Sequence, residues 1–177
     1  MTARRSDIVC ISTQAWGYLW TRKQRFMERF AQLGYRVLYV EPIEPFLWQW
    51  KGPGYNQSLG IAAQVNQVKP NLHVLSLPVM LPFSRRYRLL NWLNQERAIP
   101  IIRRCMDRLD MRSPIVWTYT PLVGKRISAL GGRRLVYDCV DAFGQYPGMG
   151  RFAQGMEDDL LRRADVVLVT SGRLLAR

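Results

Sequence analysis

Two carboxylates, Asp138 and Asp141, stand together directly after an apolar run that ends in Tyr137. A sugar hydroxyl is a poor nucleophile until a base accepts its proton, and two neighbouring carboxylates can supply that base and an orienting partner. The same spacing also suits a structural role, in which one carboxylate caps a turn and the other pairs with an arginine. Asp138 and Asp141 are therefore candidate catalytic residues, and the structural alternative stays open.

Other polar side chains follow the remaining predicted strands. In a parallel α/β sheet, ligands bind beyond the carboxyl ends of the strands, so these positions are candidate substrate-binding residues. Loops are polar whatever their role, so each position also has an explanation as an ordinary loop residue. The candidates are Thr13, Gln14, Trp16, Gly17, Glu41, Thr120, Thr170 and Ser171.

The sequence lacks the motifs of several common enzyme chemistries. Gly17 stands alone in the loop after the first strand, so a dinucleotide fingerprint is missing, and no GxxxxGK[ST] run occurs. His73 is the only histidine, and its place on the polar side of an alternating segment predicts a solvated surface residue. Cys10, Cys105 and Cys139 have no CxxC spacing, which predicts buried thiols. We therefore expect neither a metal nor a cofactor.

The charge of the chain indicates an anionic partner. The chain holds 26 lysine and arginine residues against 13 aspartate and glutamate residues, a formal net charge of +13. Most of the basic residues are arginine, whose planar guanidinium suits phosphate. Nucleic acid, anionic lipid headgroups and sugar nucleotides all carry phosphate, and charge alone does not choose between them.

The elements that must position these residues alternate between strand and helix. Alternation of this kind is typical of a Rossmann-like α/β fold, a mostly parallel sheet flanked by helices. At 177 residues we expect a single domain. The predicted strands are 7–12, 36–40, 115–119, 134–138 and 165–169, and the predicted helices are 22–33, 122–130 and 152–163.

Three segments interrupt this alternation. Residues 63–68 and 72–77 flank a turn and predict a strand pair. Pro100 interrupts the helical stretch 85–109, so we expect two helices there. Residues 45–59 combine aromatic side chains with a Gly-Pro-Gly turn, which predicts an aromatic loop.

Three stretches together resemble the N-terminal domain of GT-B glycosyltransferases. They are residues 7–42 (DIVCISTQAWGYLWTRKQRFMERFAQLGYRVLYVEP), 115–121 (IVWTYTP) and 135–174, which includes LVYDCVDAFGQYPG and EDDLLRRADVVLVTSGRL. The most specific element is the YDCVD strand end, followed by a Glu-led helix and the ADVVLVTS strand. More narrowly, the stretches are similar to glycosyltransferase family 4 relatives that build bacterial cell-surface polysaccharide, including the teichuronic acid type.

The resemblance implies that residues 1–177 form the acceptor-binding N-terminal half of a two-domain enzyme. The C-terminal half, which binds the nucleotide sugar in such enzymes, would lie outside this chain. The implied reaction moves a sugar from a nucleotide-sugar donor to a glycan or lipid-linked acceptor. Many relatives carry a histidine where this chain has Asp138, so that histidine's role does not transfer. Thr13, Gln14 and Trp16 stand where relatives use a Gly-Gly turn against donor phosphates.

The positive charge and the resemblance together predict a cytoplasmic enzyme that is attached peripherally to the membrane. Its arginine-rich face and the aromatic residues 46–50 would lie on anionic headgroups, although a simple solvated face explains the charge as well. A nucleic-acid-binding module and a noncatalytic interaction domain are the alternatives. Nucleic acid is the less favoured partner because no recognisable motif occurs and the basic residues are spread over several helices.

Overall fold

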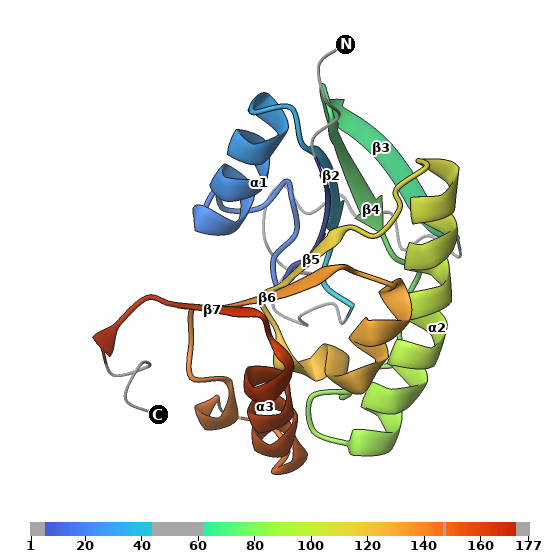
Figure 1. Ribbon diagram of the computed structural model, residues 1–177. Helices are drawn as coiled ribbons and strands as arrows, with labels where there is room; N and C mark the ends of the chain where they lie inside the picture. The colour runs from blue at the N-terminus through green and yellow to red at the C-terminus, as the bar shows by residue number, and fades with distance from the viewer. Residues whose placement is uncertain (1–5, 44–61, 147, 173–177) are drawn as a thin grey trace.

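The computed structural model describes residues 6–43, 62–146 and 148–172 and forms one seven-stranded sheet with helices on both faces (Figure 1). The strand order is β3-β4-β2-β1-β5-β6-β7, and every neighbouring pair is parallel except β3 with β4. This confirms the predicted Rossmann-like architecture and the strand pair. The strands are β1 (Asp7–Ile11), β2 (Arg36–Val40), β3 (Gln64–Lys69), β4 (Leu72–Ser76), β5 (Ile115–Thr118), β6 (Arg134–Cys139) and β7 (Val166–Val169).

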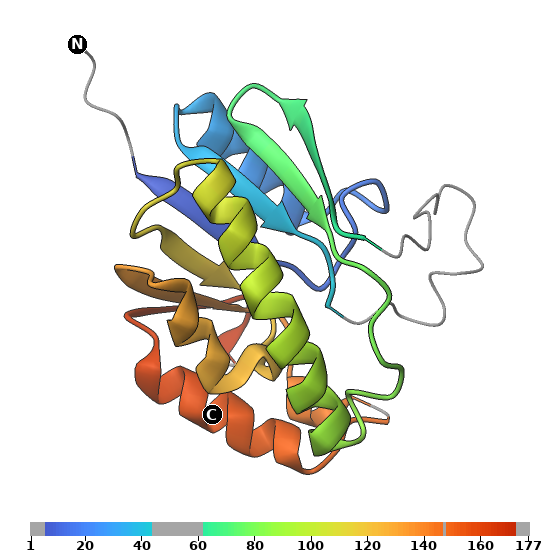
Figure 2. The same ribbon diagram turned by 90° about the vertical axis from the view of Figure 1, so that its right-hand side faces the viewer.

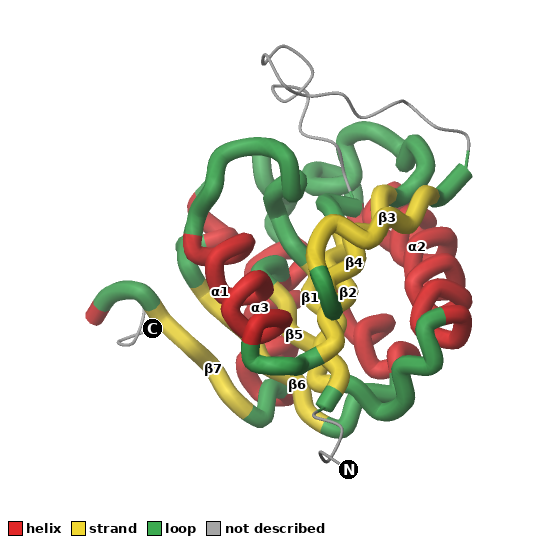
Figure 3. Tube along the Cα trace, turned by 90° about the horizontal axis from the view of Figure 1, so that it is seen from above, coloured by secondary structure: helices red, strands yellow, loops and turns green. Residues whose placement is uncertain are grey.

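The helices divide between the two faces of the sheet. Helix α1 (Arg22–Gln32) packs on β2 and β4, while α2 (Arg88–Arg108), the 3-10 segment η2 (Pro121–Leu130) and α3 (Phe152–Arg163) pack together on the other face. Figures 2 and 3 show this separation, with α1 and α2 on opposite sides of the central strands. A short 3-10 turn, η3 (Phe143–Gln145), precedes α3.

Strand alternation creates two apolar layers. Val9, Ile11 and Val116 face α2 and η2, and Ile8, Cys10 and Trp117 face α1. Because successive strand side chains point to opposite faces, Asp138 lies on the α1 side and its neighbours Tyr137 and Cys139 lie on the α3 side. All three cysteines are free and buried, as predicted.

The expected division of residues 85–109 into two helices is wrong. Helix α2 continues through Pro100 over 21 residues. A proline inside a helix costs about 3 kcal/mol. Buried apolar side chains lie on both sides of it, among them Ala98, Ile99, Ile102 and Met106, so packing on the sheet offsets that cost.

Residues 121–130 form a 3-10 segment in place of the predicted α-helix. Gly124 breaks the helical geometry with φ 50° and ψ −153°, and Gly131 ends the segment in the left-handed region at φ 65°. Glycine adopts such angles without the Cβ clash of other residues. A Cβ added to Gly124 would also lie 2.8 Å from the Cε of Met156 on α3, so the break lets η2 and α3 approach closely.

The remaining helices agree with prediction in position. Helix α3 has the predicted bounds, and α1 ends one residue early. The core face of α1 consists of Gln24, Met27 and Ala31. Phe26 is exposed, and its ring meets Trp117 at the border of this face.

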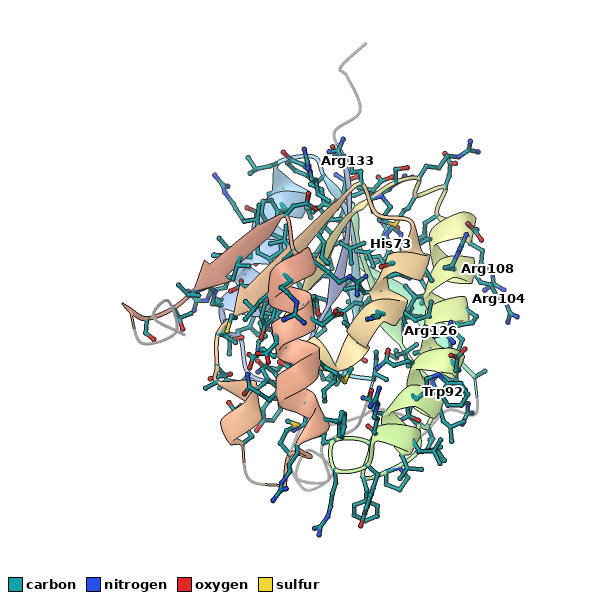
Figure 4. All side chains as sticks on the ribbon, turned by 60° about the horizontal axis from the view of Figure 1, so that its bottom comes forward. His73, Trp92, Arg104, Arg108, Arg126 and Arg133 are labelled. Carbon is teal, nitrogen blue, oxygen red and sulfur yellow. The ribbon has the colours of Figure 1, made fainter. Side chains whose placement is uncertain are left out.

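His73 differs from the prediction. Its side chain is half-buried on β4 between β2 and β3, and its Nδ1 has no hydrogen-bond partner among the described residues (Figure 4). Burial, with the nearby Arg36 guanidinium, lowers the pKa of His73. The antiparallel β3 pairs with β4 and places Gln67 opposite His73, a neighbour that alternation in one segment does not reveal.

The predicted aromatic loop at residues 45–59 lies outside the described residues, as does Leu174. Within the described part of the chain, every helix is too short or too polar to cross a bilayer.

Candidate functional site

The predicted site residues follow or end five neighbouring strands at the carboxyl edge of the sheet. They form a row in the order β2, β1, β5, β6 and β7. Adjacent strands lie about 4.8 Å apart, so Glu41 at one end and Thr170 at the other are separated by roughly 20 Å. The structure therefore places these residues on one edge but does not gather all of them into one cluster.

The loop after β1 uses its polar side chains to hold its own shape. Gln14 is buried; its Nε2 donates to the Leu19 carbonyl at 2.6 Å, and its Oε1 accepts from the Thr21 hydroxyl at 3.0 Å. Thr21 in turn caps α1 in a capping box with Gln24. Gln14 thus connects the loop to the start of α1.

Glu41 fixes the same loop from the neighbouring strand. This buried carboxylate accepts the Trp16 backbone N–H at 2.9 Å and the Ser76 hydroxyl at 2.7 Å, which joins the ends of β1, β2 and β4. The Trp16 ring packs against Tyr39 at a centroid distance of 5.0 Å. Gly17 remains exposed at the tip of the loop.

We expect Glu41→Ala to lower the free energy of unfolding by about 2 kcal/mol, because it leaves a backbone N–H and a hydroxyl without their acceptor. Urea unfolding measures this loss. Glu28→Ala is the control: it removes a surface ion pair with Lys69, which should cost at most about 1 kcal/mol. Equal stability of Glu41→Ala and the wild type would contradict this structural role.

Three threonines and a serine complete the row. Thr120 is buried, and its hydroxyl accepts the Leu122 N–H to cap η2. Thr170 and Ser171 are exposed, and the Thr170 hydroxyl donates to the Val140 carbonyl at 3.1 Å. Thr13 and Thr120 line a small cavity of about 30 Å³, which is about the volume of one water molecule.

Asp138 forms a buried ion pair at the same edge. Its carboxylate has 0% exposure, and both of its oxygens lie 3.1 Å from Nη2 of Arg22, the first residue of α1. Arg22 also lies over the Phe26 ring, 4.8 Å from its centroid. Burial raises the pKa of Asp138, and Arg22, Tyr119 and Trp117 oppose that rise.

Lys23 provides a second cation beside Asp138 and Asp141. Its Nζ lies 5.6 Å from the centroid of the Tyr119 ring. Burial lowers the pKa of Lys23, while Asp141 and, more weakly, Asp138 oppose the decrease. Asp141 is half-buried just beyond β6 and helps to raise the pKa of Tyr146, for which burial is the larger cause.

Sequence reasoning missed Arg22 and Lys23. A usable signal was present, because the helix that follows the first strand begins at the carboxyl edge of the sheet. Cations are unfavourable at a helix N-terminus, so two of them in the first turn of α1 indicate an anionic neighbour. The described residues offer no group of three or more His, Cys, Asp or Glu side chains that could hold a metal ion.

Comparison with known proteins supports the fold. Neither a protein-family model nor a curated protein matches the chain. One solved structure that resembles it is described as "Trehalose-6-phosphate from E. coli bound with UDP-2-fluoro glucose", a GT-B glycosyltransferase. The two align over 92% of this chain and 39% of the other, with 11% sequence identity and a TM-score of 0.50.

The fold is therefore similar to that of a GT-B glycosyltransferase. The chain spans 39% of the length of the aligned protein. The narrower teichuronic acid type stays a prediction.

Proposed function

We propose that this chain is the acceptor-binding domain of a glycosyltransferase that uses a nucleotide-activated sugar. The observation that carries the proposal is the group of Asp138, Asp141, Arg22 and Lys23 at the carboxyl edge of a GT-B-like sheet. Ligands of open α/β sheets bind beyond this edge. Carboxylates and cations together match what glycosyl transfer requires there.

In the proposed reaction, an acceptor hydroxyl attacks the anomeric carbon of the donor sugar. The new C–O bond replaces the bond to the nucleoside diphosphate, which leaves with the bonding electron pair. A carboxylate accepts the hydroxyl proton, and Arg22 and Lys23 stabilise the negative charge of the leaving phosphate. Asp141 is partly exposed in this structure, whereas Asp138 would meet a substrate only after Arg22 moves away.

We further propose that the acceptor is a glycan or lipid-linked molecule of the cell envelope and that the protein works at the cytoplasmic membrane surface. An exposed apolar patch at the start of α2 supports this: Phe83 is 56% and Leu89 65% exposed. Arg86 and Arg97 are exposed in the same segment. We give the name apolar patch to the large exposed apolar side chains of residues 79–92, which are Val79, Phe83, Tyr87, Leu89 and Trp92.

Loss of the encoding gene tests the proposed function in the source cell. We expect one surface glycan to disappear from the electrophoretic and mass-spectrometric profile of the envelope. A plasmid with the wild-type gene should restore it, and a plasmid with Asp138→Asn should not. An unchanged glycan profile would contradict the proposal.

The isolated 177-residue chain should not transfer sugar. Transfer requires donor and acceptor to be held together, and we propose that a second domain outside this chain binds the donor. The measurement is incubation of the pure chain with a panel of nucleotide sugars and lipid-linked acceptors, followed by mass spectrometry. Glycosylated acceptor above the enzyme-free control would show that one domain suffices.

A further inference from the structure

A cavity lies away from the Asp138 cluster, on the opposite face of the sheet. Its volume is about 550 Å³, which falls within the range of small-molecule sites. The N-terminal half of α2, η2 and α3 form its walls, and Figure 2 shows these elements side by side. We call this cavity the helix groove.

Cations predominate in the helix groove. Its charged lining consists of Arg88, Lys125, Arg126, Arg151 and Arg162 against the single acid Asp159. Two of these six groups have partners, since Arg126 pairs with Glu96 and Asp159 pairs with Arg163. The other four cations have no ion pair with any described residue, so the groove has an uncompensated positive charge.

Two helix N-termini add to this positive potential. Arg88 begins α2 and Phe152 begins α3, and both residues line the groove. Neither helix has a side-chain cap at its N-terminus. The free N–H groups and dipole of a helix N-terminus favour an anion such as phosphate.

Gln95 supplies an independent sign of a ligand. Its side chain is 3% exposed and lines the groove, and its Nε2 donates to the Leu122 carbonyl at 2.8 Å. A carbonyl can only accept, so this bond fixes the orientation of the amide. The Gln95 Oε1 is consequently buried without a donor among the described residues, and a ligand hydroxyl would satisfy it.

The helix groove continues toward the carboxyl edge of the sheet. Asn91, Gln95 and Val123 line both this groove and the small cavity that contains Thr13 and Thr120. A ligand in the groove would therefore lie next to the edge where the proposed transfer takes place, with these three buried side chains between them. Trp92, half-exposed on α2 in the same wall, offers a flat apolar surface to a sugar ring (Figure 4).

We propose that the helix groove binds a phosphorylated sugar, with the phosphate among the cations of η2 and α3 and a sugar hydroxyl on Gln95 Oε1. The description of this ligand as an acceptor rests on the proposed function. The binding itself does not, because it requires neither donor nor transfer. Phosphate accounts for the charge and the helix N-termini, and the hydroxyl accounts for the unpaired amide oxygen.

Isothermal titration of the 177-residue chain tests this proposal with three probes: glucose 1-phosphate, inorganic phosphate and farnesyl phosphate. Glucose 1-phosphate should bind more tightly than the other two. The double variant Arg151→Gln, Arg162→Gln should weaken its binding about tenfold or more, because each charge-assisted hydrogen bond contributes at least that much. The control, Arg104→Gln with Arg108→Gln, removes the same charge from the C-terminal half of α2, away from Trp92 (Figure 4), and should bind normally.

Gln95→Glu provides a second variant of nearly unchanged shape. It introduces a negative charge into the groove that holds the phosphate and should weaken glucose 1-phosphate binding, while thermal unfolding verifies that the variant is folded. Equal affinities for glucose 1-phosphate and inorganic phosphate would overturn the sugar assignment, as would preferential binding of farnesyl phosphate. If the groove variant and the control variant weaken glucose 1-phosphate binding equally, the loss comes from net charge alone, and the proposed site is wrong. Failure of the envelope glycan test would leave these binding results intact, so the two proposals fail separately.

Discussion

Replacement of Asp138 by asparagine is expected to lower turnover of the transfer-competent enzyme by about 100-fold to 10,000-fold, the range that a general base contributes. Asparagine keeps the size of the side chain and can still face Arg22, but it cannot accept the proton of an acceptor hydroxyl. Initial rates with saturating donor measure the loss.

The thermal stability of Asp138→Asn should stay the same or rise, although its turnover falls. Burial raises the pKa of Asp138 above its ordinary value of 3.8, so the folded state binds this proton more tightly than the unfolded chain does. Between 3.8 and the raised pKa, the folded state therefore loses stability as pH rises. At neutral pH, Asp138→Asn removes this cost and should unfold at the same or a higher temperature than the wild type.

This difference in unfolding temperature should shrink as pH falls toward 3.8, where Asp138 becomes protonated in both states. Thermal unfolding monitored by circular dichroism at several pH values measures it. Asp141→Asn is the matched comparison, because that carboxylate lies half-buried at the same edge. Near wild-type turnover in both variants, or lower stability of Asp138→Asn at neutral pH, would make the Asp138–Arg22 pair structural.

Anionic vesicles should bind the chain about 100-fold more tightly than neutral vesicles at low salt. Each arginine near a negatively charged membrane contributes about 1 kcal/mol, and Arg86, Arg88 and Arg97 lie exposed around the apolar patch. Raising the salt concentration from 0.1 M to 1 M shortens the Debye length from about 10 Å to about 3 Å and should release most of the bound protein. Cosedimentation with phosphatidylserine and phosphatidylcholine vesicles measures both effects.

The apolar patch can be tested apart from charge. Phe83→Ser with Leu89→Ser should weaken vesicle binding, whereas Leu33→Ser with Leu161→Ser, which changes exposed leucines at the C-cap of α1 and on α3, should not. Single-stranded RNA serves as a competitor in the same assay. Tighter binding to RNA than to anionic vesicles would favour the nucleic-acid-binding alternative.

The sequence predicts the architecture well because short local patterns of residue type determine each strand and helix. Strand β1 (Asp7–Ile11) contains a short apolar run between Asp7 and Ser12, and α3 combines helical periodicity with a preceding glycine, Gly150. Each pattern depends on residues within a few positions of one another. The order of strands and helices then restricts the topology, since parallel strands need crossover connections.

The roles of the edge residues could not be predicted in the same way. The rule that ligands bind at carboxyl ends selected Gln14, Glu41 and Thr120, and the structure uses the polar side chains of all three to hold loops or cap a helix. Their hydrogen-bond partners depend on how the loops pack. Residue type alone does not distinguish a polar group that binds a ligand from one that satisfies a buried backbone.

By itself, the sequence determined the alternation of strands and helices, the buried cysteines and the large positive charge. Only the tertiary structure decided that α2 runs through Pro100, that Arg22 meets Asp138 across 116 positions, and that α2, η2 and α3 enclose a cationic groove. The physical reason is the range of the interactions. Backbone propensity and hydrophobic periodicity act between neighbours in the chain, whereas ion pairs, cavities and buried polar partners arise between segments that only the packed sheet brings together.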